Sequence, residues 1–287
     1  MKKNYFKILF TTFVICFFAN NLSAQGVFVK VNVGYGFGIG TQTWMNNSTR
    51  NVNSVTGVNT GTEEAVKISL GKGLNFAGTI GAMFNKNVGA ELGINYLIGG
   101  KTTCKDEYNY TGNLIIPSYT RTTENIFSAN MLKINPSILV TSGSKEIDPY
   151  AKFGIVLGFG SATSERTETY SSGDINESAF KYSGGMSIGI TSAFGVNFNL
   201  NKNMAIFGEL NMTNLSYAPK KGIYLKYSEN GVDQLATMTT IEKEVEYVDS
   251  YTYDSSVAAN VTQPDKQTSI KLPFSSLGIN LGIKIKL

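Results

Sequence analysis

Apolar residues alternate one by one with small or polar residues in segment after segment of this chain. From Val27 to Ile39 every odd-numbered residue is apolar, whereas Lys30, Asn32 and glycines occupy the even positions after Phe28. A period of two turns successive side chains toward opposite faces of a β-strand. The pattern therefore predicts a strand with one apolar face and one small or polar face.

The same alternation recurs along the chain and predicts eight strands. They cover residues 27–39, 74–84, 88–98, 132–138, 150–160, 186–198, 204–212 and 277–287. The connections are alternately short and long: the short ones are 85–87, 141–148 and 201–203, and the long polar ones are 41–64, 101–124, 161–179 and 218–272. Bacterial outer-membrane barrels have this asymmetry, because their periplasmic turns are short and their extracellular loops are long.

The glycines indicate which face of the strands points outward. Gly34, Gly36, Gly38, Gly154 and Gly158 all lie on the non-apolar face. On the outside of a soluble barrel such glycines weaken the strands, whereas inside a narrow barrel they leave room for larger neighbours. We therefore expect an all-β fold, an eight-stranded antiparallel transmembrane β-barrel with its apolar face toward lipid, short periplasmic turns and long extracellular loops.

The N-terminus predicts export from the cytoplasm. Lys2, Lys3 and Lys7 precede an almost unbroken apolar stretch over 8–19, and the small residue Ala24 closes the segment. This is the layout of a secretory signal peptide. The apolar stretch is too short for a membrane-spanning helix, which needs about 20 residues.

The expected organisation is a signal peptide over 1–24 and an outer-membrane β-barrel over 25–287, with residues 218–272 as its long final extracellular loop. Cys16 falls within the signal peptide, so Cys104 is the one cysteine expected in the mature chain. A single cysteine excludes a disulfide within the mature chain, and the sequence assigns Cys104 no role.

Composition argues against several classes of function. The chain has no histidine, the residue that most often takes a proton near neutral pH in catalysis and that many metal sites use. Cleavage of the signal peptide removes three lysines and no acid from a total of 25 basic and 21 acidic residues, so no basic excess remains for nucleic-acid binding. We expect a protein that is not an enzyme and that has no catalytic residues, no cofactor, no metal site and no nucleic-acid partner.

Two of the long connections need separate interpretations. Segment 41–61 is rich in Asn, Ser, Thr and Gly, which is typical of a mobile surface loop. Within the final loop, 223–227 and 237–248 look like strands. As membrane strands, the second would turn Lys243 toward lipid at a cost of about 2–4 kcal/mol. We expect a hairpin above the membrane, and ten barrel strands remain the alternative.

Four charged residues fall on the lumen face by strand parity and at similar depth: Lys30, Glu91, Lys152 and Glu209. Alternating charges around a narrow lumen are expected to form ion pairs that close it. One interpretation is a packed interior in which the charges satisfy one another. The other is a gate whose pairing switches and admits ions.

Two segments resemble a known family. The run from Asp148 to Gly160 and the run from Asn197 to Leu210 resemble strands of small outer-membrane β-barrel proteins, the group that includes the OmpA transmembrane domain, OmpX, OmpW and the opacity proteins. The segment Ser23-Ala24-Gln25 is similar to precursors from Bacteroidetes. Many members end in an aromatic residue that the barrel-assembly machinery reads, whereas this sequence ends at Leu287.

The pattern and the resemblance favour a non-catalytic protein of the cell outer membrane with a structural or surface-interaction role. The alternative is a narrow channel or porin-like transport of small solutes. The expected partners are outer-membrane lipid and lipopolysaccharide and, during insertion, the barrel-assembly machinery. An extracellular ligand bound by the loops is a further expected partner, and the sequence does not identify it.

Overall fold

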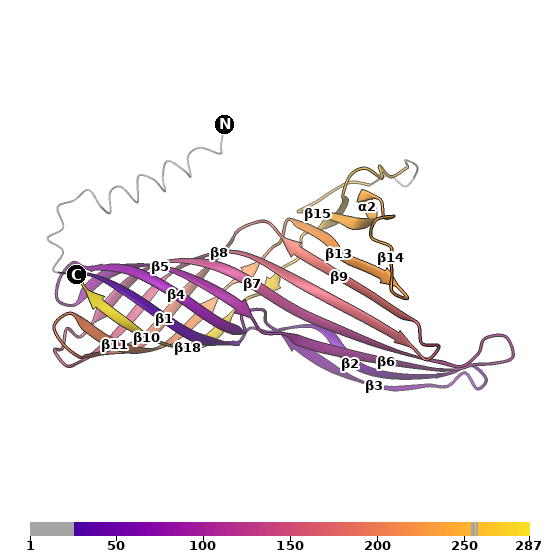
Figure 1. Cartoon of the computed structure of the whole chain (residues 1–287), viewed down its shortest axis with the longest axis horizontal. Helices are drawn as coiled ribbons and strands as arrows, with labels where there is room; N and C mark the ends of the chain where they lie inside the picture. Colours follow the sequence, from indigo (N-terminus) through magenta and orange to yellow (C-terminus); the bar gives the residue numbers. More distant parts are fainter. Residues whose placement is uncertain (1–25, 254–255, 257) are drawn as a thin grey trace.

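The structure, a computed structural model, describes residues 26–253, 256 and 258–287 and is composed almost wholly of β-strands (Figure 1). The all-β class predicted from the alternation is confirmed. The signal peptide predicted over 1–24 lies outside the described residues. A single turn of helix, α2 (Thr240–Lys243), interrupts the strands. No helix in the described part of the chain has the length and apolar character needed to cross a membrane.

Eight antiparallel strands form a closed ring. In order around it they are β1 (Gly26–Gly38), β4 (Gly73–Met83), β5 (Val88–Gly99), β7 (Tyr119–Thr141), β8 (Ile147–Tyr170), β10 (Ser187–Asn199), β11 (Met204–Asn214) and β18 (Ser276–Lys286). The last strand pairs back onto the first, from Phe28 opposite Lys286 to Gly38 opposite Ser276. Each of the eight predicted segments overlaps one of these strands.

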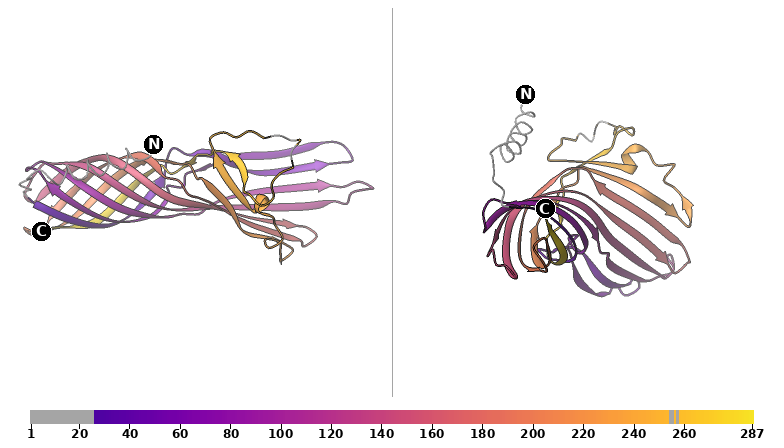
Figure 2. Two further views of the ribbon diagram at one scale, coloured as in Figure 1. Left: turned by 90° about the horizontal axis from the view of Figure 1, so that it is seen from above. Right: turned by 60° about the vertical axis from the view of Figure 1, so that its left-hand side comes forward.

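The strands β7 and β8 continue far beyond the ring and carry a second sheet (Figures 1 and 2). In this outer sheet the order is β16-β15-β13-β9-β8-β7-β6-β2-β3. The added strands are β2 (Gln42–Asn53), β3 (Asn59–Ile68), β6 (Thr102–Thr111), β9 (Ile175–Ser183), β13 (Lys221–Glu229), β15 (Glu244–Val248) and β16 (Asp265–Thr268), and β14 (Val232–Asp233) pairs with β13. Thus the long polar connections of the sequence are largely strands.

The prediction of a mobile surface loop over 41–61 is therefore wrong. These residues form β2, the turn that follows it and the start of β3, and β2 pairs in parallel with β6 from Ser48 opposite Asp106 to Asn53 opposite Thr111. The residues are polar because both faces of this sheet meet water. Threonine nevertheless favours strands, and β6, which itself pairs with the extended part of β7, supplies the backbone partner that the local sequence does not reveal.

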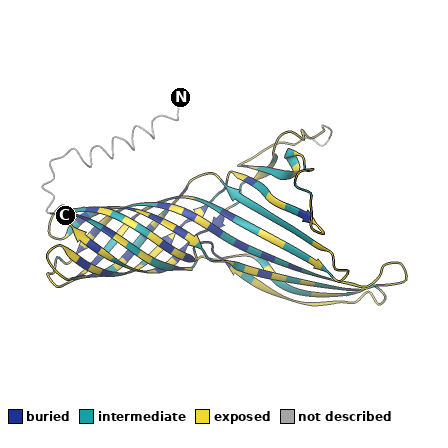
Figure 3. Ribbon diagram, viewed as in Figure 1, coloured by how far each residue is buried: buried dark blue, intermediate teal, exposed yellow. Residues whose placement is uncertain are grey.

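The two faces of the ring differ sharply (Figure 3). Outward side chains are apolar and exposed, for example Val31 at 58%, Ile94 at 54% and Ile279 at 49%. Between the two ends of the ring, the inward residues are small, polar or charged, as at Asn75, Glu91 and Thr191. A side chain at Gly34 would meet Asn280 directly, since a Cβ there would lie 1.9 Å from Asn280 Oδ1. The glycines of the lumen face therefore make room for neighbouring side chains, as the sequence predicted.

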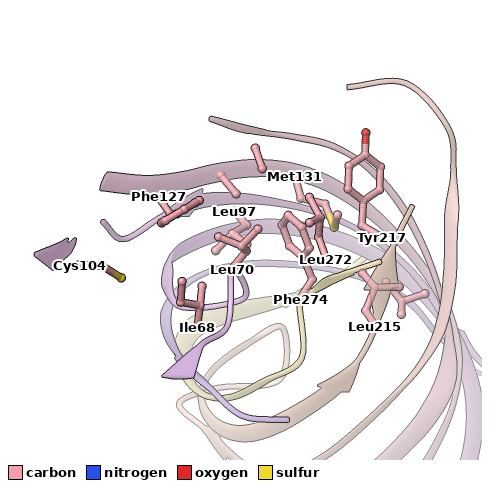
Figure 4. Close-up of a cluster of buried hydrophobic side chains, with 13 residues drawn as sticks. Ile68, Leu70, Leu97, Cys104, Phe127, Met131, Leu215, Tyr217, Leu272 and Phe274 are labelled. Carbon is pink, nitrogen blue, oxygen red and sulfur yellow. The ribbon is translucent and has the colours of Figure 1, made fainter. Parts of the chain in front are cut away.

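Two apolar clusters close the ends of the ring. One end of the ring is where β1 begins and β18 ends. There the side chains of Phe28, Leu139, Tyr150 and Phe207 pack together. At the opposite mouth a larger cluster fills the opening (Figure 4). It comprises Ile68, Leu70, Leu97, Cys104, Phe127, Ala129, Met131, Val156, Ala162, Leu215, Tyr217, Leu272 and Phe274. We call this second cluster the outer cap.

Two connecting segments cross the mouth and bring side chains into the outer cap. The amide of Leu70 donates to Pro273 O at 2.8 Å, and the amide of Phe274 donates to Leu215 O at 2.9 Å. The short strands β12 (Ser216–Tyr217) and β17 (Leu272–Pro273) pair there. These bonds satisfy backbone groups that the mouth would otherwise bury unpaired.

The final connection partly matches its prediction. β13 and β15 pair antiparallel and lie outside the ring, as expected of a hairpin above the membrane, and neither adds a ninth or tenth strand to the ring. The expected continuous strand over 237–248 is wrong, because Thr240–Lys243 forms α2. Thr239 and Glu242 make a capping box at its start, a local interaction that stabilises a helical turn over an extended one.

The hydroxyl of Tyr217 fixes the outer cap, and its removal gives a first prediction. Its single hydrogen is shared between Gly160 O at 2.7 Å and Gly184 O at 2.6 Å, and burial raises the pKa of this hydroxyl to about 12. Tyr217→Phe should lower the free energy of unfolding in lipid vesicles by about 1 kcal/mol, because the two part-buried carbonyls lose the donor that they share. Hydrogen exchange around 215–219 should accelerate. Tyr253→Phe, at an 80% exposed side chain, is the control; an equal loss there would contradict the assignment.

Candidate functional site

The four lumen charges predicted from strand parity lie together in the ring. Lys30 (β1) pairs with Glu91 (β5). Lys152 (β8) bridges the two acids, with its Nζ 3.7 Å from Glu91 Oε2 and 2.8 Å from Glu209 Oε2 (β11). The side chains of Lys30, Glu91 and Glu209 are at most 3% exposed, and that of Lys152 is 20% exposed. The four thus form a chain of alternating charge across the lumen, which we call the charged layer.

Hydrogen bonds satisfy the remaining oxygens of Glu209. The Tyr150 hydroxyl donates to Glu209 Oε2 at 3.0 Å, and Asn280 Nδ2 donates to Oε1 at 3.1 Å. A buried carboxylate is tolerated only when its lone pairs are satisfied in this way. Strand parity placed Glu209 correctly but did not reveal these two partners, although both also lie on the lumen face of their strands.

Aromatic rings complete the surroundings of Lys30. Its Nζ lies 4.7 Å from the centroid of the Tyr150 ring, 5.3 Å from that of Phe28 and 5.4 Å from that of Phe207. These distances are within the range of cation–π attraction. The cluster of Phe28, Leu139, Tyr150 and Phe207 therefore has two roles, because it closes this end of the ring with apolar volume and offers aromatic ring faces to the ammonium group of Lys30.

Two further buried lysines belong to the lumen and were missed. Lys133 donates from Nζ to Asn75 Oδ1 at 3.0 Å, and Lys284 Nζ lies 4.1 Å from the centroid of the Phe28 ring. Neither has a salt bridge to a carboxylate among the described residues. Strand parity was sufficient to place both on the lumen face, and Lys284 lies directly opposite Lys30 in the pairing of β18 with β1, but neither was included among the four predicted charges.

A small polar cavity separates the charged layer from the outer cap. Its volume is about 40 Å³, and Lys133, Asn95, Asn135 and Asn211 are among its lining residues. The Oδ1 atoms of these three asparagines are buried and have no hydrogen-bond partner within the described chain. A cavity of this size has room for a few water molecules, and the unpaired acceptors suit such water. It is too small to be a solute pathway.

The other chemical groups singled out in the sequence form no site. Cys104 is 1% exposed within the outer cap, and burial raises the pKa of its thiol, which disfavours the reactive thiolate. No group of three or more Cys, Asp or Glu side chains in the described part of the chain is arranged to hold a metal ion.

The fold and the lumen together define a class of protein. A closed ring of antiparallel strands satisfies every backbone group inside a bilayer, and β-proteins cross membranes only as such closed rings. Apolar side chains cover its outside, and polar and charged ones fill its inside. Rings of this kind belong to the bacterial outer membrane. The class is that of the outer-membrane β-barrel proteins, and the location is the one that the sequence predicted.

The sequence matches no family model and no curated protein. Among solved structures, the chain is similar to Ail, the attachment invasion locus protein of Yersinia pestis, in complex with the heparin analogue sucrose octasulfate; the identity is 7%, the coverage 91% of this chain and 99% of that chain, and the TM-score 0.34.

Two further solved structures are similar over most of their length. CarO of Acinetobacter baumannii has 13% identity, covers 93% of this chain and 100% of its own, and has a TM-score of 0.33. The outer membrane protease OmpT from Escherichia coli has 8% identity, and the similarity covers 92% of this chain and 98% of OmpT, with a TM-score of 0.25. None of these TM-scores exceeds 0.34, so the class stated above rests on the ring and outward face of this chain.

The charged layer yields a second prediction. Glu91→Gln should lower the free energy of unfolding by about 3–5 kcal/mol, because two buried lysines lose a carboxylate. The double variant Lys30→Met/Glu91→Leu should recover most of that loss, since a packed apolar pair replaces an ion pair at little cost. Urea unfolding in lipid vesicles measures both.

A matched control lies in the outer sheet. Glu124 pairs with Lys105 at 3.7 Å, with side chains 41% and 65% exposed, so Glu124→Gln should cost less than about 1 kcal/mol. If Glu91→Gln costs no more than this control, the charged layer does not hold the ring together.

Proposed function

We propose that the mature chain is a non-catalytic outer-membrane protein: an eight-stranded antiparallel transmembrane barrel with short periplasmic turns, whose role is to anchor the outer sheet at the cell surface. The observation that carries the proposal is the double closure of the lumen, by the charged layer and by the outer cap. A filled interior leaves the exterior, and above all the outer sheet, as the part available for interaction.

The outer sheet suits a role in surface interaction. Because β7 and β8 run without interruption from the ring into this sheet, it is held at a fixed distance and direction from the membrane. Outer-membrane lipid and lipopolysaccharide are the partners of the apolar outward face, and the barrel-assembly machinery is the partner during insertion. Strand edges and turns of the outer sheet are the proposed contact region for an extracellular ligand.

The second candidate function is transport through a narrow lumen. The polar cavity of about 40 Å³ beside Lys133 favours it, because a cavity with room for a few water molecules would form one section of a longer path. For transport, both the ion pairs of the charged layer and the apolar packing of the outer cap would have to open. An enzymatic role has less support than either candidate, since the sequence has no histidine, the usual proton acceptor of such sites.

Planar-bilayer recording separates the two candidates. The folded mature protein should be silent, and Glu209→Lys should be silent too, because the outer cap closes the mouth independently of the charged layer. Under the transport hypothesis the outer cap opens by itself, so the same charge reversal, which breaks the contact with Lys152, should produce steady openings. A refolded porin recorded in the same bilayers shows that conductance is detectable.

The orientation of the protein gives a fourth prediction. Cysteines introduced by Thr56→Cys, in the β2–β3 turn, and by Lys202→Cys, in the turn before β11, are both at exposed positions. On intact cells a membrane-impermeant maleimide should label only the first, and the second should react after the outer membrane is permeabilised. The native Cys104 is 1% exposed and should not react in either condition. Labelling of Lys202→Cys on intact cells would reverse the proposed orientation.

A further inference from the structure

Two neighbouring turns lie at the end of the outer sheet farthest from the ring (Figure 1), and both turns have exposed aliphatic side chains. In the turn between β6 and β7, Leu114 is 105% exposed, Ile115 89% and Ile116 48%. In the turn between β2 and β3, Val55 is 71% exposed and Val58 55%. Exposed apolar residues that cluster in this way mark sites of interaction with a protein or a membrane. We call these two turns the apolar tips.

The β6–β7 tip is an ordered turn. Asn113 Oδ1 accepts hydrogen bonds from the amides of Ile115 at 2.9 Å and Ile116 at 3.0 Å, and the Asn113 amide donates to Ile116 O at 2.9 Å. Gly112 permits the close approach, because a Cβ there would lie 2.2 Å from Ile116 O. These local hydrogen bonds fix the conformation of the turn in which the aliphatic side chains are exposed to water.

The two apolar tips start side by side. β2 and β6 pair in parallel as far as Asn53 opposite Thr111. Beyond that pair, Ser54 donates to Thr111 O from its amide at 3.1 Å and from its Oγ at 2.8 Å. In the β2–β3 tip, Asn53 Oδ1 accepts from the amides of Val55 and Thr56, both at 3.0 Å. The exposed valines are thus presented next to the exposed leucine and isoleucines.

The surroundings of the apolar tips distinguish a lipid partner from a protein partner. Segments 51–62 and 109–120 contain no Asp, Glu, Lys or Arg. Behind the β6–β7 tip lie three contacting tyrosine rings: Tyr119 is 5.9 Å from Tyr108 and 5.3 Å from Tyr110 between centroids. Arg121 follows, 5.6 Å from the Tyr108 ring.

This succession matches the layers of a bilayer surface. Aliphatic groups prefer the acyl region, tyrosine prefers the interface between acyl chains and headgroups, and arginine extends into the headgroups and water. Protein-binding sites more often combine aromatic anchors with a charged or polar rim that pairs with the partner. Two narrow turns projecting from a sheet are also convex, so they suit insertion into a deformable lipid phase.

We infer that the apolar tips insert into the interface of an apposed lipid bilayer, one other than the membrane that holds the ring. The inference rests on the proposed function, because it needs the outer sheet to project from the cell. It adds the partner: a lipid surface recognised through apolar contact rather than through the charge of its headgroups. The protein then bridges two membranes, anchored by the ring in one and by the tips in the other.

Flotation with liposomes tests this inference. The full mature chain is held in nanodiscs and mixed with phosphatidylcholine liposomes that contain no protein, and the fraction that floats with the liposomes is measured. The wild-type protein should float, and the variant L114S/I115S/I116S should lose at least about tenfold in partitioning, because three exposed aliphatic side chains no longer enter lipid. Heat-modifiable migration on gels checks that each variant is folded.

A matched control variant removes aliphatic side chains elsewhere on the outer sheet. Leu225 and Val232 are 52% and 60% exposed on β13 and β14, so L225S/V232S should float like the wild type. Equal loss in this variant, or none in the tip variant, would overturn the inference. So would binding that requires anionic lipid and disappears in salt, since the apolar tips carry no charge.

A fluorescent probe reports insertion directly. The environment-sensitive dye NBD on Ile115→Cys should brighten and shift to the blue with phosphatidylcholine liposomes, and brominated acyl chains should quench it; the buried Cys104 stays unlabelled. A response only to vesicles that contain membrane proteins would replace the lipid by a protein partner. If the maleimide experiment confirms the orientation and the wild type still ignores liposomes, the inference fails and the proposed function stands.

Discussion

The pairing of β18 with β1 is the constraint on which the rest of the structure depends. A backbone N–H or C=O left unpaired within a bilayer costs several kcal/mol, so the first and last ring strands must meet along their length, from Phe28 opposite Lys286 to Gly38 opposite Ser276. A ring of eight strands has an interior just wide enough to be filled by side chains. Closure therefore determines what the lumen accepts: glycine beside bulky neighbours, as at Gly34 beside Asn280, and charges only where they meet a partner.

The filling of the lumen changes along its axis in a way that favours closure. Aromatic residues at the base present ring faces to Lys30, the charged layer above them neutralises its own charges, a small polar cavity follows, and the outer cap seals the mouth with apolar volume. Each layer contacts a layer that suits it: the aromatic rings lie against Lys30, and the polar cavity lies against the charged layer. The ion pairs are weak evidence of stability by themselves, but separating them to open the lumen would leave buried charges without their partners, and that is costly.

Strand parity in the sequence was sufficient to predict the ring strands and to bring Lys30, Glu91, Lys152 and Glu209 to one face, because a period of two is a local property. It was not sufficient for Tyr150 and Asn280, whose contacts with Glu209 depend on the stagger between strands. The outer sheet escaped prediction for another reason. Segment 41–61 has no apolar face that would mark it as a strand. It forms strands because β7 extends beyond the ring and pairs with β6, and β6 in turn pairs with β2, from which it is far away in sequence.

Polarity along β7 inverts where this strand leaves the ring, and the inversion places the outer boundary of the membrane. Within the ring its inward residues are polar, such as Lys133 and Asn135, and its outward ones are apolar, with Ile138 58% exposed. Past Asn130 the inward residues Phe127 and Ala129 belong to the outer cap, whereas the outward positions Ser128 and Glu124 are polar and Ile126 between them is the exception. One strand thus has lipid outside and polar side chains inside at one end, and water outside and an apolar core inside at the other. A single continuous strand can satisfy both only if the solvent around it changes, and that change of solvent is what sets the outer sheet and its apolar tips beyond the bilayer that holds the ring.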